Sequence, residues 1–261
     1  MQGDARLLSL WKIKFWMNES STLYQNPARH TYMDASNTDG HHRSILDNVL
    51  TYVGLRPGDH VIEVGSGSGR YSELLLAAGL RVTAIEPDHV LYEKSLARLS
   101  TRSNIRIVRA GVGELPSDLE PVHAVCGFHV LHHLDASSLD RLKTDIDQIA
   151  FRQDSRFRGW FFVEPNPFNI LYPVQITIHP GMKWREERGI WAQARYRRLP
   201  WNFRFAAGLI PPQLCRLIRP ALLKRVPNRL WETRVPWALY EVFGARMGSH
   251  AEAPSNATRP L

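Results

Sequence analysis

The chain has 261 residues, of which 44% are hydrophobic and 22% charged, a balance that favours a folded domain over extended disorder. Residues 1–150 carry 15 Lys and Arg against 18 Asp and Glu (net −3), and residues 151–261 carry 18 against 7 (net +11). The basic second half indicates either an anionic partner or a solvated, arginine-rich surface.

The cysteines and the hydropathy pattern exclude several classes of protein. Cys126 and Cys215 lie far apart in no metal-binding spacing, which argues against a disulfide framework or a zinc site. No apolar run approaches the roughly 18–20 residues of a membrane span. The first 20 residues have scattered charges and no small-residue cleavage site, so no signal peptide is predicted. We therefore expect a soluble, cytoplasmic protein.

The predicted elements alternate between helix and strand up to residue 165. Residues 1–40 show no clean period and are predicted to form an N-terminal cap. A helix is predicted over 41–55, where apolar residues recur at helical spacing before a Gly-containing turn. The pattern then predicts strand 60–64, helix 71–79, strand 81–86, helix 88–100, strands 105–110 and 123–128, helix 137–151 and strand 160–164.

This alternation is typical of right-handed βαβ units and predicts an α/β fold with a doubly wound, mostly parallel sheet. In such sheets the ligand lies beyond the carboxyl ends of the strands. Residues 41–165 are thus predicted to be a cofactor-binding core. Residues 166–261 are predicted to be a substrate-side insertion with closing strands within 194–205 and 237–247, and to belong to the same domain.

The stretch VIEVGSGSGR (61–70) places three glycines at alternate positions directly after the first strand. The dinucleotide-binding fingerprint is G-x-G-x-x-G, whereas this turn is G-x-G-x-G with Glu63 two residues before the first glycine. A carboxylate at that place suits a cationic amino-acid ligand and would repel a pyrophosphate. Glu86, at the end of the second strand, is placed to accept both hydroxyls of a ribose.

These motifs resemble the class I S-adenosylmethionine-dependent methyltransferases over residues 41–165. VIEVGSGSG is similar to the first motif of that family, VTAIEPD to its acidic second strand, and AVCGFHVLHHL to its fourth strand and the following turn. GELP (113–116) resembles the segment beside the adenine. The resemblance implies a seven-stranded Rossmann-like sheet with helices on both faces, and S-adenosylmethionine as cofactor.

The resemblance also implies which residues bind the cofactor. Glu63, Gly65, Ser66 and Gly67 would contact the methionyl part, Glu86 the ribose, and the backbone of Val112 the adenine. The predicted cofactor-binding set also includes Gly69, Pro87 and Phe128. Many relatives carry an Asp where this chain has Gly111, so Glu114, the backbone or water would take over that contact.

His129 follows the fourth strand and is the predicted catalytic residue, as the base that removes a proton from the acceptor. The alternative is a hydrogen-bonded histidine in the wall of the site. His132 and His133 match a stretch that is mostly structural in the family, and no acid or cysteine completes a metal set with them, so no metal is predicted.

Three further residues are predicted to bind the substrate. Tyr32 and His42 lie in or beside the cap segment, which folds over the cofactor in similar enzymes. Glu164 ends the fifth strand in EPNP and either faces the acceptor or fixes the proline turn.

The acceptor is predicted to be a small, partly apolar molecule, with O-methylation favoured over N- or C-methylation. The chain lacks the [DN]-P-P-[YFW] motif of nucleic-acid amino methyltransferases and the Pro-Cys of cytosine C5 enzymes, so no nucleic-acid partner is expected. A role in small-molecule or natural-product metabolism follows from this. The alternatives are a non-catalytic, cofactor-binding regulatory protein or an NAD(P)-dependent oxidoreductase.

Residues 211–226 (PPQLCRLIRPALLKRV) are amphipathic and basic. Such a helix can lie on an anionic membrane, which predicts a peripheral membrane contact. The alternative is that its leucines pack on the domain while its arginines are solvated.

Overall fold

The computed structural model describes residues 39–116, 118–153, 156–178, 183–192, 194–209, 229–230 and 234–247. Tyr32, the predicted cap except for its last two residues, and the predicted helix 211–226 lie outside the described residues. The division at residues 40 and 165 stays a prediction.

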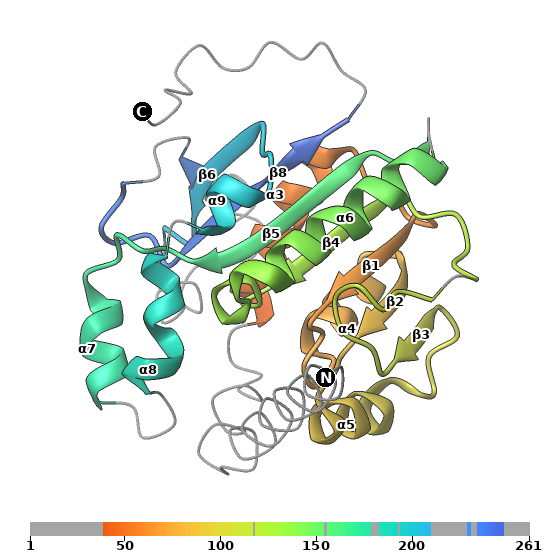
Figure 1. Ribbon diagram of the computed structural model, residues 1–261, viewed down its shortest axis with the longest axis horizontal. Helices are drawn as coiled ribbons and strands as arrows, with labels where there is room; N and C mark the ends of the chain where they lie inside the picture. The colour runs from red at the N-terminus through yellow and green to blue at the C-terminus, as the bar shows by residue number, and fades with distance from the viewer. Residues whose placement is uncertain are drawn as a thin grey trace, which may run out of the picture.

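One twisted sheet forms the centre of the molecule (Figure 1). Its strands are β1 (His60–Val64), β2 (Arg81–Ile85), β3 (Ile105–Val108), β4 (Ala124–Phe128), β5 (Gly159–Pro165), β6 (Phe203–Ala207), β7 (Arg229–Leu230) and β8 (Tyr240–Arg246). Their order is β3-β2-β1-β4-β5-β8-β6-β7. The first five strands are parallel, and β8, β6 and β7 are antiparallel to their neighbours. The predicted doubly wound α/β fold is confirmed, with the two-residue β7 added at the edge.

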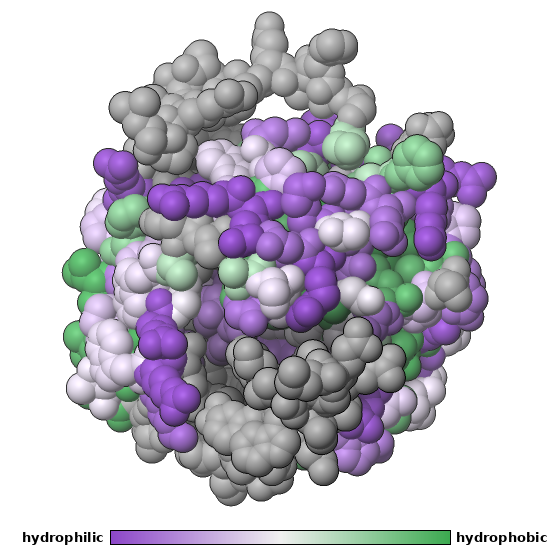
Figure 2. All heavy atoms as spheres, viewed as in Figure 1, coloured by the Kyte–Doolittle hydropathy of each residue, from purple (hydrophilic) through white to green (hydrophobic). Residues whose placement is uncertain are grey.

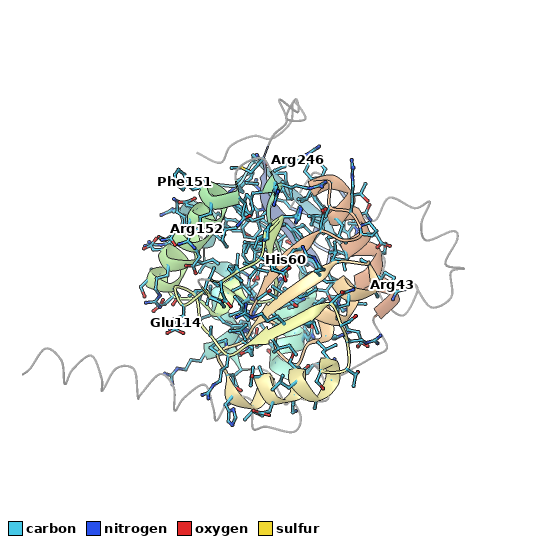
Figure 3. The ribbon with its side chains drawn as sticks, turned by 90° about the vertical axis from the view of Figure 1, so that its right-hand side faces the viewer. Arg43, His60, Glu114, Phe151, Arg152 and Arg246 are labelled. Atoms are coloured by element: carbon cyan, nitrogen blue, oxygen red, sulfur yellow. The ribbon has the colours of Figure 1, made fainter. Side chains whose placement is uncertain are left out.

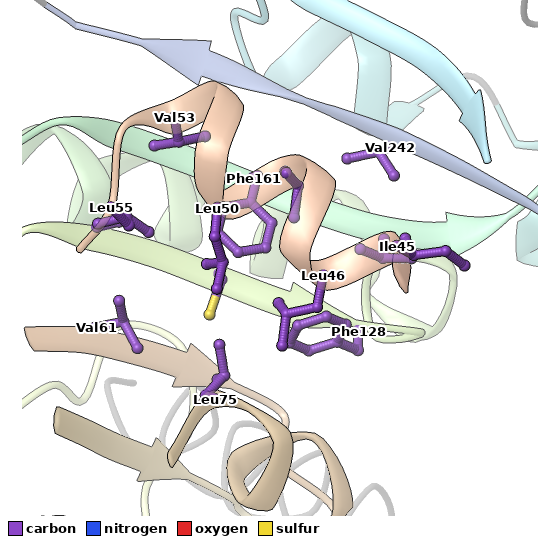
Figure 4. Packing of buried hydrophobic residues seen from close by; sticks show 14 of the residues in the cluster. Ile45, Leu46, Leu50, Val53, Leu55, Val61, Leu75, Phe128, Phe161 and Val242 are labelled. Carbon is purple, nitrogen blue, oxygen red and sulfur yellow. The ribbon is translucent and has the colours of Figure 1, made fainter. Parts of the chain in front are cut away.

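Helices cover both faces of the sheet. One face carries α3 (Asp39–Val53), α4 (Arg70–Ala77) and α5 (His89–Leu99), and the other carries α6 (Ala136–Gln153). Figure 4 shows side chains of α3 pointing at β4, β5 and β8. Within α6 the buried residues Leu139, Leu142, Ile146 and Ile149 recur at helical spacing. The strands are short apolar runs because both faces of the sheet are covered.

The chain beyond β5 departs from the sequence prediction. The structure places α7 (Leu171–Ile178), α8 (Trp184–Glu187) and the 3₁₀ turn η4 (Arg188–Trp191) where no regular element was expected. The strand predicted within 194–205 begins only at Phe203, as β6, and the first half of that range forms the helix α9 (Ala194–Arg198). Arg and Tyr residues in this stretch are compatible with either structure, so local pattern did not decide.

A buried polar cluster joins the last three elements. Glu241 of β8 is fully buried and forms an ion pair with Arg204 of β6, with 2.6 Å between Nη2 and Oε2. The Tyr196 hydroxyl of α9 donates to the other carboxylate oxygen, and the Arg204 guanidinium lies 4.1 Å from the centre of the Tyr196 ring. Each polar group therefore has its partner inside the protein, as burial requires.

Two asparagines fasten the segment before β8 to the end of β5. The Asn166 side-chain amide donates to the carbonyls of Val235 and Ala238, and the Asn169 amide donates to the Ala238 carbonyl. Both side chains are buried. The start of β8 is thereby held at the carboxyl edge of the parallel strands. No helix in the described part of the chain is both long and apolar enough to cross a membrane.

Candidate cofactor and acceptor site

The glycine turn lies at the carboxyl end of β1, as predicted. Gly65, Gly67 and Gly69 have φ angles of +68°, +57° and +79°, which L side chains rarely adopt. The amides of Gly65 and Ser66 donate to the Ile85 carbonyl, so the turn is tied to the end of β2. A Cβ on Gly65 would lie 2.5 Å from Cγ2 of Val130. Gly65 is therefore needed for the close packing of the turn against the segment that follows β4.

Gly69 has a packing role in the structure. It precedes α4, and a Cβ there would lie 2.6 Å from a Leu99 methyl group and 2.8 Å from the Ser95 hydroxyl, both on α5. Its predicted contact with the cofactor stays a prediction.

Glu86 connects the glycine turn to the end of β2. Its carboxylate accepts hydrogen bonds from the amides of Gly67 (2.8 Å) and Asp88 (2.9 Å). Burial raises the pKa of Glu86 to about 7, and the nearby Asp88 carboxylate adds to the rise. A carboxylate offers about four acceptor positions, so about two remain for a pair of ligand hydroxyls. Pro87, also predicted to bind the cofactor, is exposed beside it.

Glu63 lies beneath the first turn of α4. Its carboxyl group is buried and accepts a hydrogen bond from the Ser72 hydroxyl. Burial raises the pKa of Glu63 to about 8, the Ser72 hydrogen bond opposes this rise, and the charge of Glu86 adds to it. At neutral pH the group is mostly protonated in the free protein. A cation nearby would favour its ionised form.

Ser66 offers a polar atom that no described residue of the chain uses. Its hydroxyl is buried and has no hydrogen-bond partner within the described residues. Buried hydroxyls normally have partners, so a ligand group is expected to complete this one. The glycine turn, the open positions on Glu86 and the Ser66 hydroxyl together fit a ligand with an amino-acid part and a ribose.

The loop after β3 is held on the other side of the sheet. The Gly111 amide donates to Glu114 (2.9 Å), and the Gly113 amide donates to Asp145 of α6 (2.6 Å). Figure 3 shows Glu114 on the flank opposite Arg43 of α3. The Glu114 carboxylate thus lies beside position 111, where many relatives carry an Asp. Val112 is half-buried between these anchors, and its adenine contact stays a prediction.

His129 follows β4 in a strained conformation. Its φ of +55° is the only positive value of a non-glycine residue among those described. Its amide donates to the Val163 carbonyl of β5 (2.8 Å), which holds the turn in place. Burial lowers the pKa of His129 to about 4, while the Glu164 charge opposes the shift. The imidazole is therefore neutral at pH 7 and can accept a proton.

Aromatic rings surround His129. Tyr71 of α4 stacks on Phe128 at 4.3 Å between ring centres and on His129 at 5.8 Å. Tyr240 of β8 meets His129 edge to face at 5.1 Å. Phe128 also belongs to the core beneath α3 (Figure 4), so its predicted cofactor contact remains a prediction.

His42 is joined to this ring cluster by two hydrogen bonds. Its Nδ1 lies 3.2 Å from Nη2 of Arg70, and its Nε2 lies 3.0 Å from the Tyr240 hydroxyl. A guanidinium can only donate, so Nδ1 accepts and the proton of the neutral ring is on Nε2. His42 consequently donates to the Tyr240 oxygen. Tyr240 thus contacts both His129, the predicted base, and His42, which was predicted to bind the substrate.

Sequence reasoning missed Arg70, Tyr71 and Tyr240. Arg70 and Tyr71 directly follow the glycine turn, so their place in the motif was the available signal. Tyr240 had no local signal, because only the pairing of β8 with β5 places it opposite Pro165.

Glu164 supports the turn after β4. Its carboxylate accepts hydrogen bonds from the amides of Val130 and Leu131 (2.9 Å each) and pairs with Nδ1 of His132 at 2.7 Å. His132 in turn lies 3.6 Å from Glu187 of α8. These partners belong to the chain itself, and a contact of Glu164 with an acceptor stays a prediction. In the described part of the chain no three His, Cys, Asp or Glu side chains gather to hold a metal.

Comparison with known proteins agrees with this geometry. Residues 61–149 match the family model described as a methyltransferase domain. An uncharacterized methyltransferase of Geobacillus kaustophilus is 27% identical over 124 residues, which are 43% of this chain and 57% of that relative. Ribosomal RNA small subunit methyltransferase A of Chlamydia trachomatis is 45% identical over 56 residues, 22% of this chain and 20% of that relative.

Solved structures show the same fold. The methyltransferase domain of bacterial CtHen1 superposes with a TM-score of 0.50 at 16% identity, over 81% of this chain and 100% of that one. Residues 61–149 therefore match a methyltransferase domain, in agreement with the resemblance to the class I S-adenosylmethionine-dependent family. The chain spans 57% and 20% of the length of the two curated relatives above. Their match therefore does not establish the activity of the whole protein.

We expect binding of S-adenosylhomocysteine to strengthen as the pH rises from about 6 to about 7.5. Glu63, with its pKa raised to about 8, must lose a proton to pair with the ligand ammonium group, and this loss becomes easier as the pH rises. One linked proton changes the affinity by up to about tenfold per pH unit, or about 1.4 kcal/mol. Calorimetric titration across this range measures the slope.

The Glu63→Gln variant is the control, because its amide cannot ionise. Its affinity should depend less steeply on pH, with the remaining slope due to Glu86. An unchanged slope in this variant would show that Glu63 does not face the ligand.

Proposed function

We propose that the protein transfers a methyl group from S-adenosylmethionine to a small, partly apolar acceptor, with oxygen as the favoured acceptor atom. The observation that carries this proposal is the ring cluster of Tyr71, Phe128, His129 and Tyr240 at the carboxyl edge of the sheet. Apolar walls with a few placed polar groups are typical of small-molecule sites.

The cofactor would supply an electrophilic methyl group on a sulfonium. The acceptor oxygen would take this methyl group, with the electron pair of the carbon–sulfur bond remaining on sulfur. The rings exclude water from this displacement. The neutral imidazole of His129 takes the proton that the acceptor hydroxyl loses as the new bond forms.

The hydroxyl of Tyr240 orients the acceptor molecule in the site. His42 donates to its oxygen, and Arg70 fixes the proton of His42 on Nε2. A neutral imidazole with a lowered pKa is a weak base, so its role favours acceptors whose proton leaves readily, such as phenolic hydroxyls. This chemistry is the basis for preferring O-methylation.

The proposal is tested with labelled S-adenosylmethionine and a panel of phenols, carboxylic acids, amines and total RNA. Label should enter a small hydroxyl compound, and His129→Asn should lower kcat by roughly 100-fold, the smaller end of general-base effects. Binding of S-adenosylhomocysteine should be unchanged in that variant. Label in RNA alone, or no transfer while the cofactor binds, would contradict the proposal.

Three other expectations are kept as proposals. The role in small-molecule metabolism follows from the proposed acceptor, and the cytoplasmic location from the spacing of the cysteines. A membrane contact through residues 211–226 lies outside the described residues and is separately testable by charge reversal there.

A further inference from the structure

The outer side of α7 is apolar and exposed. Only Tyr172 and Ile176 of this helix are buried, four residues apart on its inner side. Leu171, Val174 and Ile178 form the outer stripe and are 57%, 54% and 74% exposed, and Ile170 before the helix is 67% exposed. A contiguous apolar stripe of this kind marks an interaction surface on a water-facing helix.

Two tryptophans flank this stripe. Trp184 of α8 donates from its indole to the Thr177 hydroxyl at 3.3 Å and is 49% exposed. Trp237 is 60% exposed and follows Pro236, whose carbonyl accepts from the Ile170 amide. Tryptophan combines an apolar body with one polar donor and is enriched where apolar and aqueous phases meet.

The charge around the stripe is mostly basic. Among the side chains that the structure describes in 166–192 and 234–239, which do not include that of Glu186, the exposed charged ones are Lys183, Arg185, Arg188 and Arg234. The acidic Glu187 is buried against His132. Figure 2 shows hydrophobic atoms gathered over α7 at one edge, beside a column of strongly hydrophilic atoms over α8. We name this surface, Ile170–Ile178 with Trp184, Trp237 and these four basic residues, the α7 face.

We propose that the α7 face docks the protein on an anionic lipid bilayer. The apolar stripe and the two tryptophans would enter the boundary between headgroups and acyl chains, while the basic residues lie against acidic headgroups. A second copy of the chain fits less well, because a two-fold contact sets the same patch against itself and opposes the basic residues of both copies. The basic residues therefore favour an anionic lipid surface over a second copy of the chain as the partner.

The position of the α7 face in the fold determines how the protein would be oriented on the membrane. Figure 1 shows α7 and α8 beyond the carboxyl end of β5, the edge that also carries His129. Docking would turn this edge of the sheet toward the membrane. An acceptor dissolved in the bilayer would then meet the site, a consequence that rests on the proposed function, whereas the docking does not.

The test is sedimentation of the full chain with vesicles of phosphatidylcholine alone or mixed with phosphatidylserine, at about 0.1 M and about 1 M salt. The protein should pellet with the mixed vesicles at low salt. The triple variant Leu171→Gln, Val174→Gln, Ile178→Gln should bind at least about tenfold more weakly at an unchanged melting temperature, because these side chains are already exposed. Phe151→Gln is the matched control, since Phe151 is 90% exposed on α6.

A wild-type protein that stays in solution would overturn the proposal, as would a triple variant that binds like the wild type. Loss of binding on charge reversal within 211–226 alone would place the contact there instead. A triple variant that changes the oligomeric state, with no vesicle binding by the wild type, would show that the face joins two copies. None of these readouts depends on methyl transfer, so failure of the proposed function is distinguishable.

Discussion

Replacing Gly65 by alanine weakens binding of S-adenosylhomocysteine by roughly 100-fold, or about 2.8 kcal/mol. The new Cβ must occupy a left-handed conformation with φ of +68° and would lie 2.5 Å from Val130. The turn and the segment that carries His129 then move apart, and the backbone that the ligand approaches is displaced. Titration calorimetry measures the affinity, and thermal unfolding shows whether the variant is folded.

Gly58→Ala is the control for backbone strain. Gly58 has φ of +90°, but no atom lies within 4 Å of its added Cβ, and it precedes β1 at the opposite end from the glycine turn. We expect it to lose about 1 kcal/mol of stability while its affinity is unchanged. Equal affinities for wild type and Gly65→Ala would mean that the glycine turn is a tight connection and no ligand site.

Replacing Arg204 by methionine lowers the free energy of unfolding by about 3–5 kcal/mol. The substitution removes the guanidinium that forms an ion pair with the fully buried Glu241 carboxylate. It also removes the guanidinium from the face of Tyr196. Urea unfolding followed by circular dichroism measures the loss.

Arg198→Met gives the matched comparison. Arg198 pairs with Asp140, whose side chain is 58% exposed, so water replaces the lost partner. Surface pairs of this kind contribute less than about 1 kcal/mol. Similar losses in the two variants would show that burial of Glu241 does not govern the stability of the β6–β8 region.

The parallel half of the fold could be predicted because its signals are local. Strands buried on both faces are short apolar runs, and the helices between them show a 3.6-residue period with clear ends. Asp88, for example, accepts from the Leu91 amide and begins α5 within one residue of the expected start. The glycine turn and Glu86 were located for the same reason.

The acceptor side could not be predicted to the same extent. Tyr240 reaches His42 across 198 residues of chain, and only the insertion of β8 beside β5 brings them together. Glu164 is a different case. Its position at the end of a strand was predictable from the sequence, but its hydrogen bonds to the turn at 130–132 depend on the pairing of β4 with β5, which residue spacing in the sequence does not reveal. The helix α7 was missed because Pro173 and its apolar outer side contradict the usual amphipathic pattern.

The position of β8 has a consequence for how the chain is made. The strand comes last in the sequence among those described, yet it lies between β5 and β6 in the sheet. During synthesis, β5 and β6 would therefore each have one edge of unpaired backbone N–H and C=O groups until residue 246 has left the ribosome. Open edges are sites of mispairing between chains. A nascent chain stalled before residue 240 should thus be a strong client for chaperones, although its parallel strands β1 to β5 are already complete.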